Sequence, residues 1–150
     1  MHSVMRIEIA APREAIYAVA SDLEAWPSFL GHYRFNRFLA KAPAPADGGI
    51  VRMAAVRSGL PLAWTSVYRR DPAALQMHFE HLKPLTRGMV VRWDFLPVPG
   101  GTRVEIVHDF VLRWPLVGKF LAEKVIGALL VDHVAGLTLR GLKRRMEGSK

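Results

Sequence analysis

The chain has 150 residues, a hydrophobic fraction of 51% and no cysteine. This length and apolar content predict one domain, residues 1–150, with a substantial core, and they argue against disorder and rule out disulfides and thiolate chemistry. Lys and Arg outnumber Asp and Glu by 21 to 13, and the formal net charge of +8 favours weak attraction to anionic partners. No signal peptide and no apolar stretch long enough to span a bilayer is visible, so we expect a cytoplasmic protein.

The first elements combine a strand with a short helix. Residues 4–10 alternate between polar and apolar types, as a strand does, and Pro12 then stands where the first helical turn tolerates proline. Apolar residues follow at the 3.6-residue period of a helix, namely Ile16, Val19, Ala20 and Leu23. We expect this helix to end at Trp26-Pro27, with a second short helical turn around 22–26, because a residue before proline avoids the helical conformation.

The middle of the chain predicts an antiparallel meander. Short strands separated by proline and glycine clusters are expected near 32–40, 50–58, 62–70, 74–81, 88–97 and 102–112. The loop 41–49 and the turn 82–88 are candidates for a mobile lid.

After Pro115 the apolar period changes to that of a helix, which we expect over 116–147. Its glycines are expected where the helix approaches the sheet closely: Gly118, Gly127, Gly136 and Gly141. The predicted fold class is therefore α+β, with a curved antiparallel sheet of about seven strands around one long C-terminal helix.

The clearest alternation runs from Thr102 to Val111, and it gives His108 an apolar set of neighbours on one strand face. A histidine on such a face is either a core residue with a satisfied ring or a polar group that orients a ligand. Whether this face meets solid core or a cavity decides between the two readings.

The same alternation assigns one face of every other strand to the interior, where it could line a cavity. The candidate ligand-binding residues on these faces are Tyr33, Arg57, Trp64, Ser66, Phe79, Val91, Trp93, Phe95, Val104 and Ile106. Aromatic rings would stack on a flat ligand, and the polar groups would fix its orientation. Tyr68, His81 and His108 could in addition transfer protons, so they are the candidate catalytic residues.

Several local sequences, at residues 9–17, 22–27, 64–66, 93–95 and 108–110, resemble the START-like or helix-grip superfamily, specifically its polyketide cyclase/dehydrase branch. The resemblance covers essentially the whole chain and implies a deep, mostly apolar cavity between the sheet and the terminal helix. Members of this branch include polyketide aromatase/cyclases, quinone-binding proteins of the coenzyme Q type, and lipid or isoprenoid carriers. Aromatases of the family carry a cavity-facing arginine two residues after the serine of the Trp-x-Ser strand, a position that Tyr68 occupies here.

We therefore expect binding of a hydrophobic small molecule, an aromatic polyketide or an isoprenoid or quinone-like compound, without a metal or other cofactor. The alternative implied by the resemblance is an aromatase/cyclase that catalyses aldol cyclisation and dehydration of a poly-β-keto chain. Ribosome or RNA association rests on the net charge alone, and no specific nucleic acid is expected because basic and aromatic residues are not interleaved.

A basic cluster near the C-terminus comprises Arg140, Lys143, Arg144 and Arg145. Cations in the last turns of a helix complement its dipole, which explains the cluster without a partner. An acyl carrier protein or an anionic membrane surface are the partners that such a cluster would suit. The sequence predicts no oligomeric state.

Overall fold

The computed structural model describes residues 2–41, 48–57, 59–83, 88–109 and 134–148. The first half contains β1 (His2–Ile9), α1 (Arg13–Ala20), the 3-10 helix η1 (Leu23–Ser28), β2 (Tyr33–Lys41) and β3 (Gly48–Arg57). The second half contains β4 (Leu60–Asp71), β5 (Gln76–Lys83), β6 (Val90–Val98), β7 (Gly101–Asp109) and α3 (Gly136–Glu147). The predicted α+β class is confirmed. The expected helix before residue 134 and the central parts of both candidate lids, 42–47 and 84–87, lie outside the described residues.

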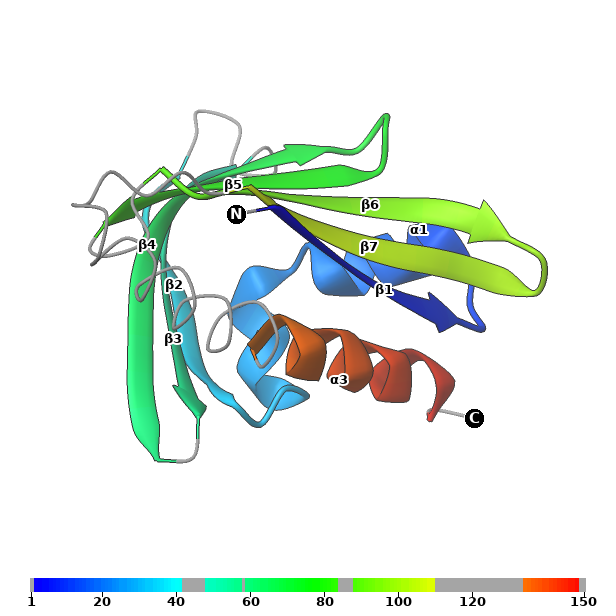
Figure 1. Cartoon of the computed structure of the whole chain (residues 1–150), viewed down its shortest axis with the longest axis horizontal. Coiled ribbons are helices and arrows are strands. Elements are labelled where there is room, and N and C mark those ends of the chain that lie inside the picture. Colours follow the sequence, from blue (N-terminus) through cyan, green and yellow to red (C-terminus); the bar gives the residue numbers. More distant parts are fainter. Residues whose placement is uncertain (1, 42–47, 58, 84–87, 110–133, 149–150) are drawn as a thin grey trace.

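All seven strands form one antiparallel sheet in the order β1-β7-β6-β5-β4-β3-β2. Strands β2 to β7 form the meander, and β1 pairs with β7 from His2↔Asp109 to Ile9↔Thr102. The sheet bends strongly, and α1, η1 and α3 lie on its concave side (Figure 1). Within the described residues, no helix is long and apolar enough to cross a membrane.

The strand register places the inward side chains in rows across the concave face. One row runs through Tyr68, Phe79, Val91 and His108 on four adjacent strands. The next brings Met77, Trp93 and Ile106 together. Because these residues are buried, the alternation that the sequence predicted separates core from solvent on β4 to β7.

The helices pack on this face through small and aromatic residues. Tyr17 of α1 packs edge-to-face against Phe95 with 5.3 Å between ring centroids, and its hydroxyl donates to the Gln76 carbonyl at 3.1 Å. On α3, a Cβ added to Gly141 would lie 2.3 Å from Leu30 Cδ2. The predicted close approach at this glycine is therefore present, but it is to the η1–β2 corner and not to a strand.

Several boundaries differ from the prediction by about two residues or more, and two of these differences have a local structural cause. Strand β5 begins at Gln76 instead of residue 74, because Leu75 has a φ of 51° and turns the chain in the left-handed region. Pro27 does not end the first helix: α1 ends at Ala20, and Pro27 lies inside the separate helix η1. A 3-10 helix accommodates proline because its short hydrogen-bond pattern leaves few backbone amides to lose.

Candidate functional site

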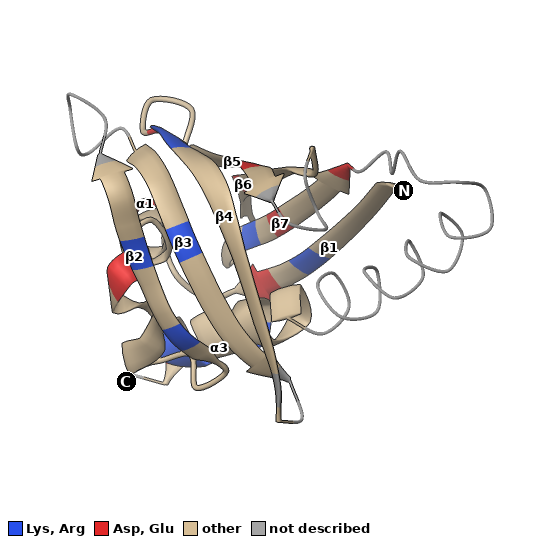
Figure 2. Cartoon of the chain, turned by 90° about the vertical axis from the view of Figure 1, so that its left-hand side faces the viewer, with Lys and Arg blue, Asp and Glu red and all other residues tan. Residues whose placement is uncertain are grey.

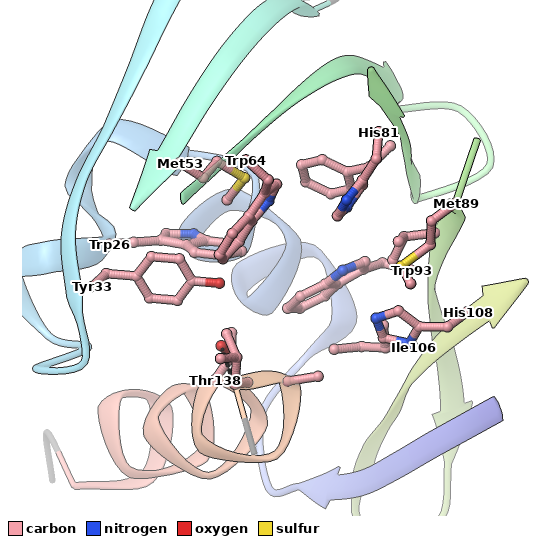
Figure 3. Close-up of a pocket in the computed structure, with 14 residues that line it drawn as sticks. Trp26, Tyr33, Met53, Trp64, His81, Met89, Trp93, Ile106, His108 and Thr138 are labelled. Carbon is pink, nitrogen blue, oxygen red and sulfur yellow. Dashed lines mark hydrogen bonds between the residues drawn. The ribbon is translucent and has the colours of Figure 1, made fainter. Parts of the chain in front are cut away.

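A cavity lies between the concave face of the sheet and the start of α3 (Figure 3). The space open to a water-sized sphere measures about 60 Å³, and all empty space between the lining atoms, including the mouth, measures about 470 Å³. The smaller volume holds a few water molecules, whereas pockets for drug-sized ligands measure roughly 300–1,000 Å³. A ligand of several rings therefore requires the lining side chains to move apart.

Most of the residues predicted to line a cavity come together here. They are Tyr33, Trp64, Phe79, His81, Val91, Trp93, Ile106 and His108. They come from five strands that are far apart in the sequence, β2 and β4 to β7. The curvature of the sheet turns their inward faces toward a common centre.

Four predicted residues are buried elsewhere: Ser66, Tyr68, Phe95 and Val104. The Tyr68 hydroxyl donates to the Ser21 carbonyl at 3.2 Å and lies 3.4 Å from Met77 Sδ. Its hydrogen is thus engaged in a structural contact, so the structure does not place Tyr68 where it could transfer a proton to a ligand in this cavity. Phe95 packs against Tyr17, and the Arg57 side chain lies outside the described part of the structure.

Six lining residues were not among the predicted ligand-binding residues: Trp26, Met53, Met89, Val134, Ala135 and Thr138. Met53 shares the inward face of β3, and Met89 is in phase with Val91, so strand alternation was the signal for both. Trp26 has a core role, since its Nε1 donates to the Ala20 carbonyl at 3.0 Å, but its ring also reaches the cavity.

The wall of the cavity is largely aromatic. The Trp26 ring lies 5.1 Å from the Tyr33 ring in an edge-to-face contact and 5.7 Å from the Trp93 ring. The Trp64 ring is parallel to the His81 imidazole within 5°, with centroids 6.1 Å apart. Such rings offer large, rigid apolar surfaces on which a flat ligand can pack.

One cluster of polar side chains at the cavity has Thr138 of α3 at its centre. Its hydroxyl donates to the Val134 carbonyl at 2.8 Å, and His32 Nε2 lies 3.1 Å from the same oxygen. Because a threonine hydroxyl has one hydrogen, the contact with His32 requires that Nε2 donates. Burial raises the pKa of the Tyr33 hydroxyl well above its usual value, while a hydrogen bond with Thr138 opposes that shift. Tyr33 is therefore neutral and presents a hydroxyl to the cavity (Figure 3).

The second polar group consists of His81 from β5 and His108 from β7 (Figure 3). Burial and, to a smaller extent, the neighbouring His108 lower the pKa of His81 to about 3. Burial also lowers the pKa of His108 to about 4, against the opposing effect of Asp109. Both imidazoles are therefore neutral at pH 7.

A neutral imidazole has one donor and one acceptor nitrogen, so each ring can bond a ligand hydroxyl or carbonyl. Nδ1 of His108 is buried and has no hydrogen-bond partner within the described residues. Such an atom carries a desolvation penalty that a ligand could remove. In the same part of the chain, no group of three or more His, Asp or Glu side chains is arranged to hold a metal ion.

Comparison with known proteins agrees with this architecture. The model of the family described as polyketide cyclase / dehydrase and lipid transport matches residues 9–134. The granaticin polyketide synthase bifunctional cyclase/dehydratase of Streptomyces violaceoruber is 32% identical over 112 residues, which are 71% of this chain and 33% of that protein. The chain thus spans about a third of the length of this relative.

Two solved structures show the same fold. Protein TTHA0849 from Thermus thermophilus has a TM-score of 0.81 and 25% identity, with 100% of this chain and 99% of that chain covered. The Zhui aromatase/cyclase from a Streptomyces species has a TM-score of 0.74 and 18% identity, with 99% and 97% covered. The START-like, helix-grip fold expected from the sequence is confirmed. With a family model that matches most of its length, the chain belongs to the polyketide cyclase/dehydrase and lipid transport family.

Proposed function

We propose that the protein binds a flat, mainly apolar molecule that carries carbonyl or hydroxyl groups, of the polyketide or quinone type, in the cavity beside α3. The observation that carries the proposal is the combination of three tryptophan rings with two neutral, buried histidines around one space. The rings supply apolar contact, and the imidazoles supply hydrogen bonds that need no charged ligand.

The polar groups also favour a ligand with hydrogen-bonding atoms at two edges. Tyr33 and Thr138 face the cavity from β2 and α3, and His81 and His108 face it from the sheet strands β5 and β7 (Figure 3). Tryptophan rings lie between the two groups. A polyaromatic ketone or a quinone has oxygen atoms spaced along a flat ring system, whereas a saturated hydrocarbon would leave the buried nitrogen of His108 unpaired.

Titration with a hydroxyanthraquinone and with an isoprenoid quinone tests this proposal, with tryptophan fluorescence as the signal. We expect saturable quenching in the wild type and about tenfold weaker binding in His108→Ala, the loss of one hydrogen bond. Tyr68→Phe is the matched control, because it removes a buried hydroxyl outside the cavity lining. Absence of saturable binding, or equal weakening in both variants, would contradict the proposal.

A second candidate function is cyclisation and dehydration of a poly-β-keto chain. The identity of 32% to a cyclase/dehydratase favours it, as does the placement of two neutral imidazoles in the cavity. In aldol closure a neutral imidazole removes a proton from a methylene between two carbonyls, the carbanion attacks another carbonyl carbon to form a C–C bond, and the imidazolium returns the proton to the new alkoxide. In dehydration an imidazole removes the remaining α-proton, and the hydroxyl takes a proton from the resulting imidazolium and leaves as water. His81 and His108 are the groups we assign to these proton transfers.

Product distribution separates catalysis from binding. A reactive poly-β-keto mimic is incubated with wild type, His81→Gln, His108→Gln and Tyr68→Phe, and with no protein. Catalysis predicts that wild type and Tyr68→Phe give the same cyclised product, and that the histidine variants shift toward the spontaneous products. If the histidine variants give the wild-type distribution, the enzymatic function is rejected and binding alone remains.

A further inference from the structure

Charges on the outer face of the sheet are distributed unequally between the three strands on one side of β5, which are β1, β7 and β6, and the three on its other side, which are β4, β3 and β2. On the half formed by β1, β7 and β6, arginines have carboxylate partners. Arg6 lies 3.3 Å from Glu105, Arg92 lies 2.7 Å from Asp94, and Arg103 lies 3.6 Å from Glu8. This half is therefore close to electrically balanced.

The other half, formed by β2, β3 and β4, carries arginines for which the described residues supply no such partners. We call Arg34, Arg37, Arg52 and Arg69 the arginine face. Strands β2 and β3 contain no Asp or Glu, and β4 contains one, Asp71 at its end. Among the described residues, no ion pair involves an arginine of this face. Figure 2 looks onto these strands and shows their Lys and Arg positions in blue.

Two of these arginines are held side by side. Arg37 on β2 is directly opposite Arg52 on β3, and like charges at such positions destabilise a sheet. Their guanidinium groups are nevertheless fixed: Arg37 lies 4.2 Å above the Phe35 ring, and Arg52 Nη1 donates to Thr65 Oγ1 at 3.0 Å. Two ordered cations with no counter-charge in the described part of the chain form a complementary surface for phosphate or carboxylate oxygens.

An apolar side chain accompanies the charges. Leu39 is 64% exposed and lies in β2 at the bulge between Phe38 and Ala40. Cations beside an exposed apolar group are typical of surfaces that bind anionic bilayers, where the charges meet lipid phosphates and the apolar group enters the interface.

Other anionic partners fit less well. Single-stranded nucleic acid requires aromatic faces on which bases can stack, and the face of Phe35 is occupied by the Arg37 guanidinium. A protein partner would need a concave acidic surface that matches the convex side of this bent sheet (Figure 2). A fluid layer of lipid headgroups adapts to that shape.

We propose that the arginine face, together with Leu39, binds membrane surfaces rich in anionic phospholipids. The inference is independent of the ligand proposed for the cavity, since it involves the opposite side of the sheet. The charge asymmetry between the two halves of the sheet orients the protein on the bilayer with β2, β3 and β4 toward the lipid.

Vesicle co-sedimentation tests the proposal, with the full chain and vesicles of phosphatidylcholine alone or mixed 3:1 with phosphatidylglycerol. Binding is expected only to the mixed vesicles, and it should be lost in about 0.5 M salt. The variant Arg37→Gln/Arg52→Gln should bind about 25-fold more weakly, because each cation near an anionic surface contributes about fivefold to affinity. Leu39→Ser should weaken binding several-fold while leaving the salt dependence unchanged.

The matched control is Arg6→Gln/Arg103→Gln, which removes the same net charge from the balanced half of the sheet. It should change vesicle binding by less than about threefold, and circular dichroism confirms that each variant is folded. Equal losses in the two double variants would show that net charge alone acts and would overturn the proposal. The proposal is also overturned if the wild type does not co-sediment with the mixed vesicles, or if it binds polyuridylate or polyglutamate more tightly than it binds the vesicles.

Discussion

The indole of Trp64 and the imidazole of His81 lie within 5° of parallel, with 6.1 Å between ring centroids. They come from adjacent strands, β4 and β5, and both line the cavity. Because burial lowers the pKa of His81 to about 3, the contact joins two neutral rings at pH 7. The contact with the Trp64 ring holds the imidazole in its orientation at the cavity wall. Trp64 therefore contributes both to the stability of the fold and to the position of His81 in the site.

Replacing Trp64 with alanine should therefore destabilise the protein by about 3–5 kcal/mol, the usual cost of removing a large buried aromatic side chain. Trp64 is 6% exposed, so little of its surface is in water before the change. Guanidinium unfolding measures the effect. Leu39→Ala is the control, because its side chain is 64% exposed and should change the free energy of unfolding by less than about 0.5 kcal/mol. A loss below about 1 kcal/mol for Trp64→Ala would contradict the packing described here.

The two buried histidines predict a decrease in stability as pH falls. Their pKa values in the folded protein, about 3 for His81 and about 4 for His108, lie below the ordinary value of about 6.5. Between these values the unfolded chain binds more protons than the folded one. The free energy of unfolding should then decrease below pH 6.5, by up to about 1.4 kcal/mol per pH unit for each histidine.

Unfolding measured at several pH values between about 8.5 and 5 tests this dependence in a range where most carboxylates remain ionised. The substitutions His108→Gln and His81→Gln should each reduce the slope of the free energy of unfolding against pH by the contribution of about one proton, which is at most about 1.4 kcal/mol per pH unit. Above pH 7.5 wild type and variants should show parallel curves. Equal slopes for wild type and both variants between pH 6.5 and 5 would show that the rings are not buried in neutral form.

Two tyrosines with the same chemistry should behave differently. Tyr68→Phe removes the donor to the Ser21 carbonyl and should cost about 1–2 kcal/mol of stability without changing ligand affinity. Tyr33→Phe removes a hydroxyl that faces the cavity, so it should weaken binding of the hydroxyanthraquinone several-fold. Fluorescence titration and chemical unfolding of both variants measure the two effects. The assignment fails if Tyr68→Phe is the variant that weakens binding.

The contrast between these tyrosines also shows what strand alternation can predict. Alternation correctly placed Trp64, Ser66 and Tyr68 on the same inward face of β4, because a side-chain period of two is a local property. It did not indicate that, of these three, Trp64 alone reaches the cavity. That depends on where α1 and the chain after it cover the strand, and the Ser21 carbonyl that holds Tyr68 is 47 residues away in sequence.

The helix side of the site was the part least open to prediction. Thr138 was not proposed; its spacing of four residues from both Val134 and Leu142 indicates the buried side of the helix but not the role of its hydroxyl. Its role depends on His32 and Tyr33, which belong to a segment far earlier in the chain, since Thr138 follows His32 by 106 positions. By contrast, His108 was identified from its strand alone, because a titratable residue on an apolar face is visible in the local pattern.

Helix α3 approaches the η1–β2 corner closely at Gly141. Whether Gly141→Ala raises or lowers the free energy of unfolding should therefore depend on the residue at position 30. Alanine is more favourable than glycine inside a helix by up to about 1 kcal/mol, so Gly141→Ala would stabilise α3 in isolation. In the protein the new Cβ would lie 2.3 Å from Leu30 Cδ2, and Leu30 is 2% exposed and cannot move away freely. Gly141→Ala should therefore destabilise the wild type by about 1–3 kcal/mol, the usual cost of overpacking.

In a Leu30→Ala background the obstructing methyl group is absent, and the same substitution should stabilise the protein by up to about 1 kcal/mol. Guanidinium unfolding of the two single variants and the double variant measures this coupling. Gly136→Ala is the control, because its Cβ would lie 3.3 Å from the ends of the Met5 and Arg140 side chains, which can adjust. Equal destabilisation by Gly141→Ala in both backgrounds would mean that Leu30 does not set the distance between α3 and the η1–β2 corner.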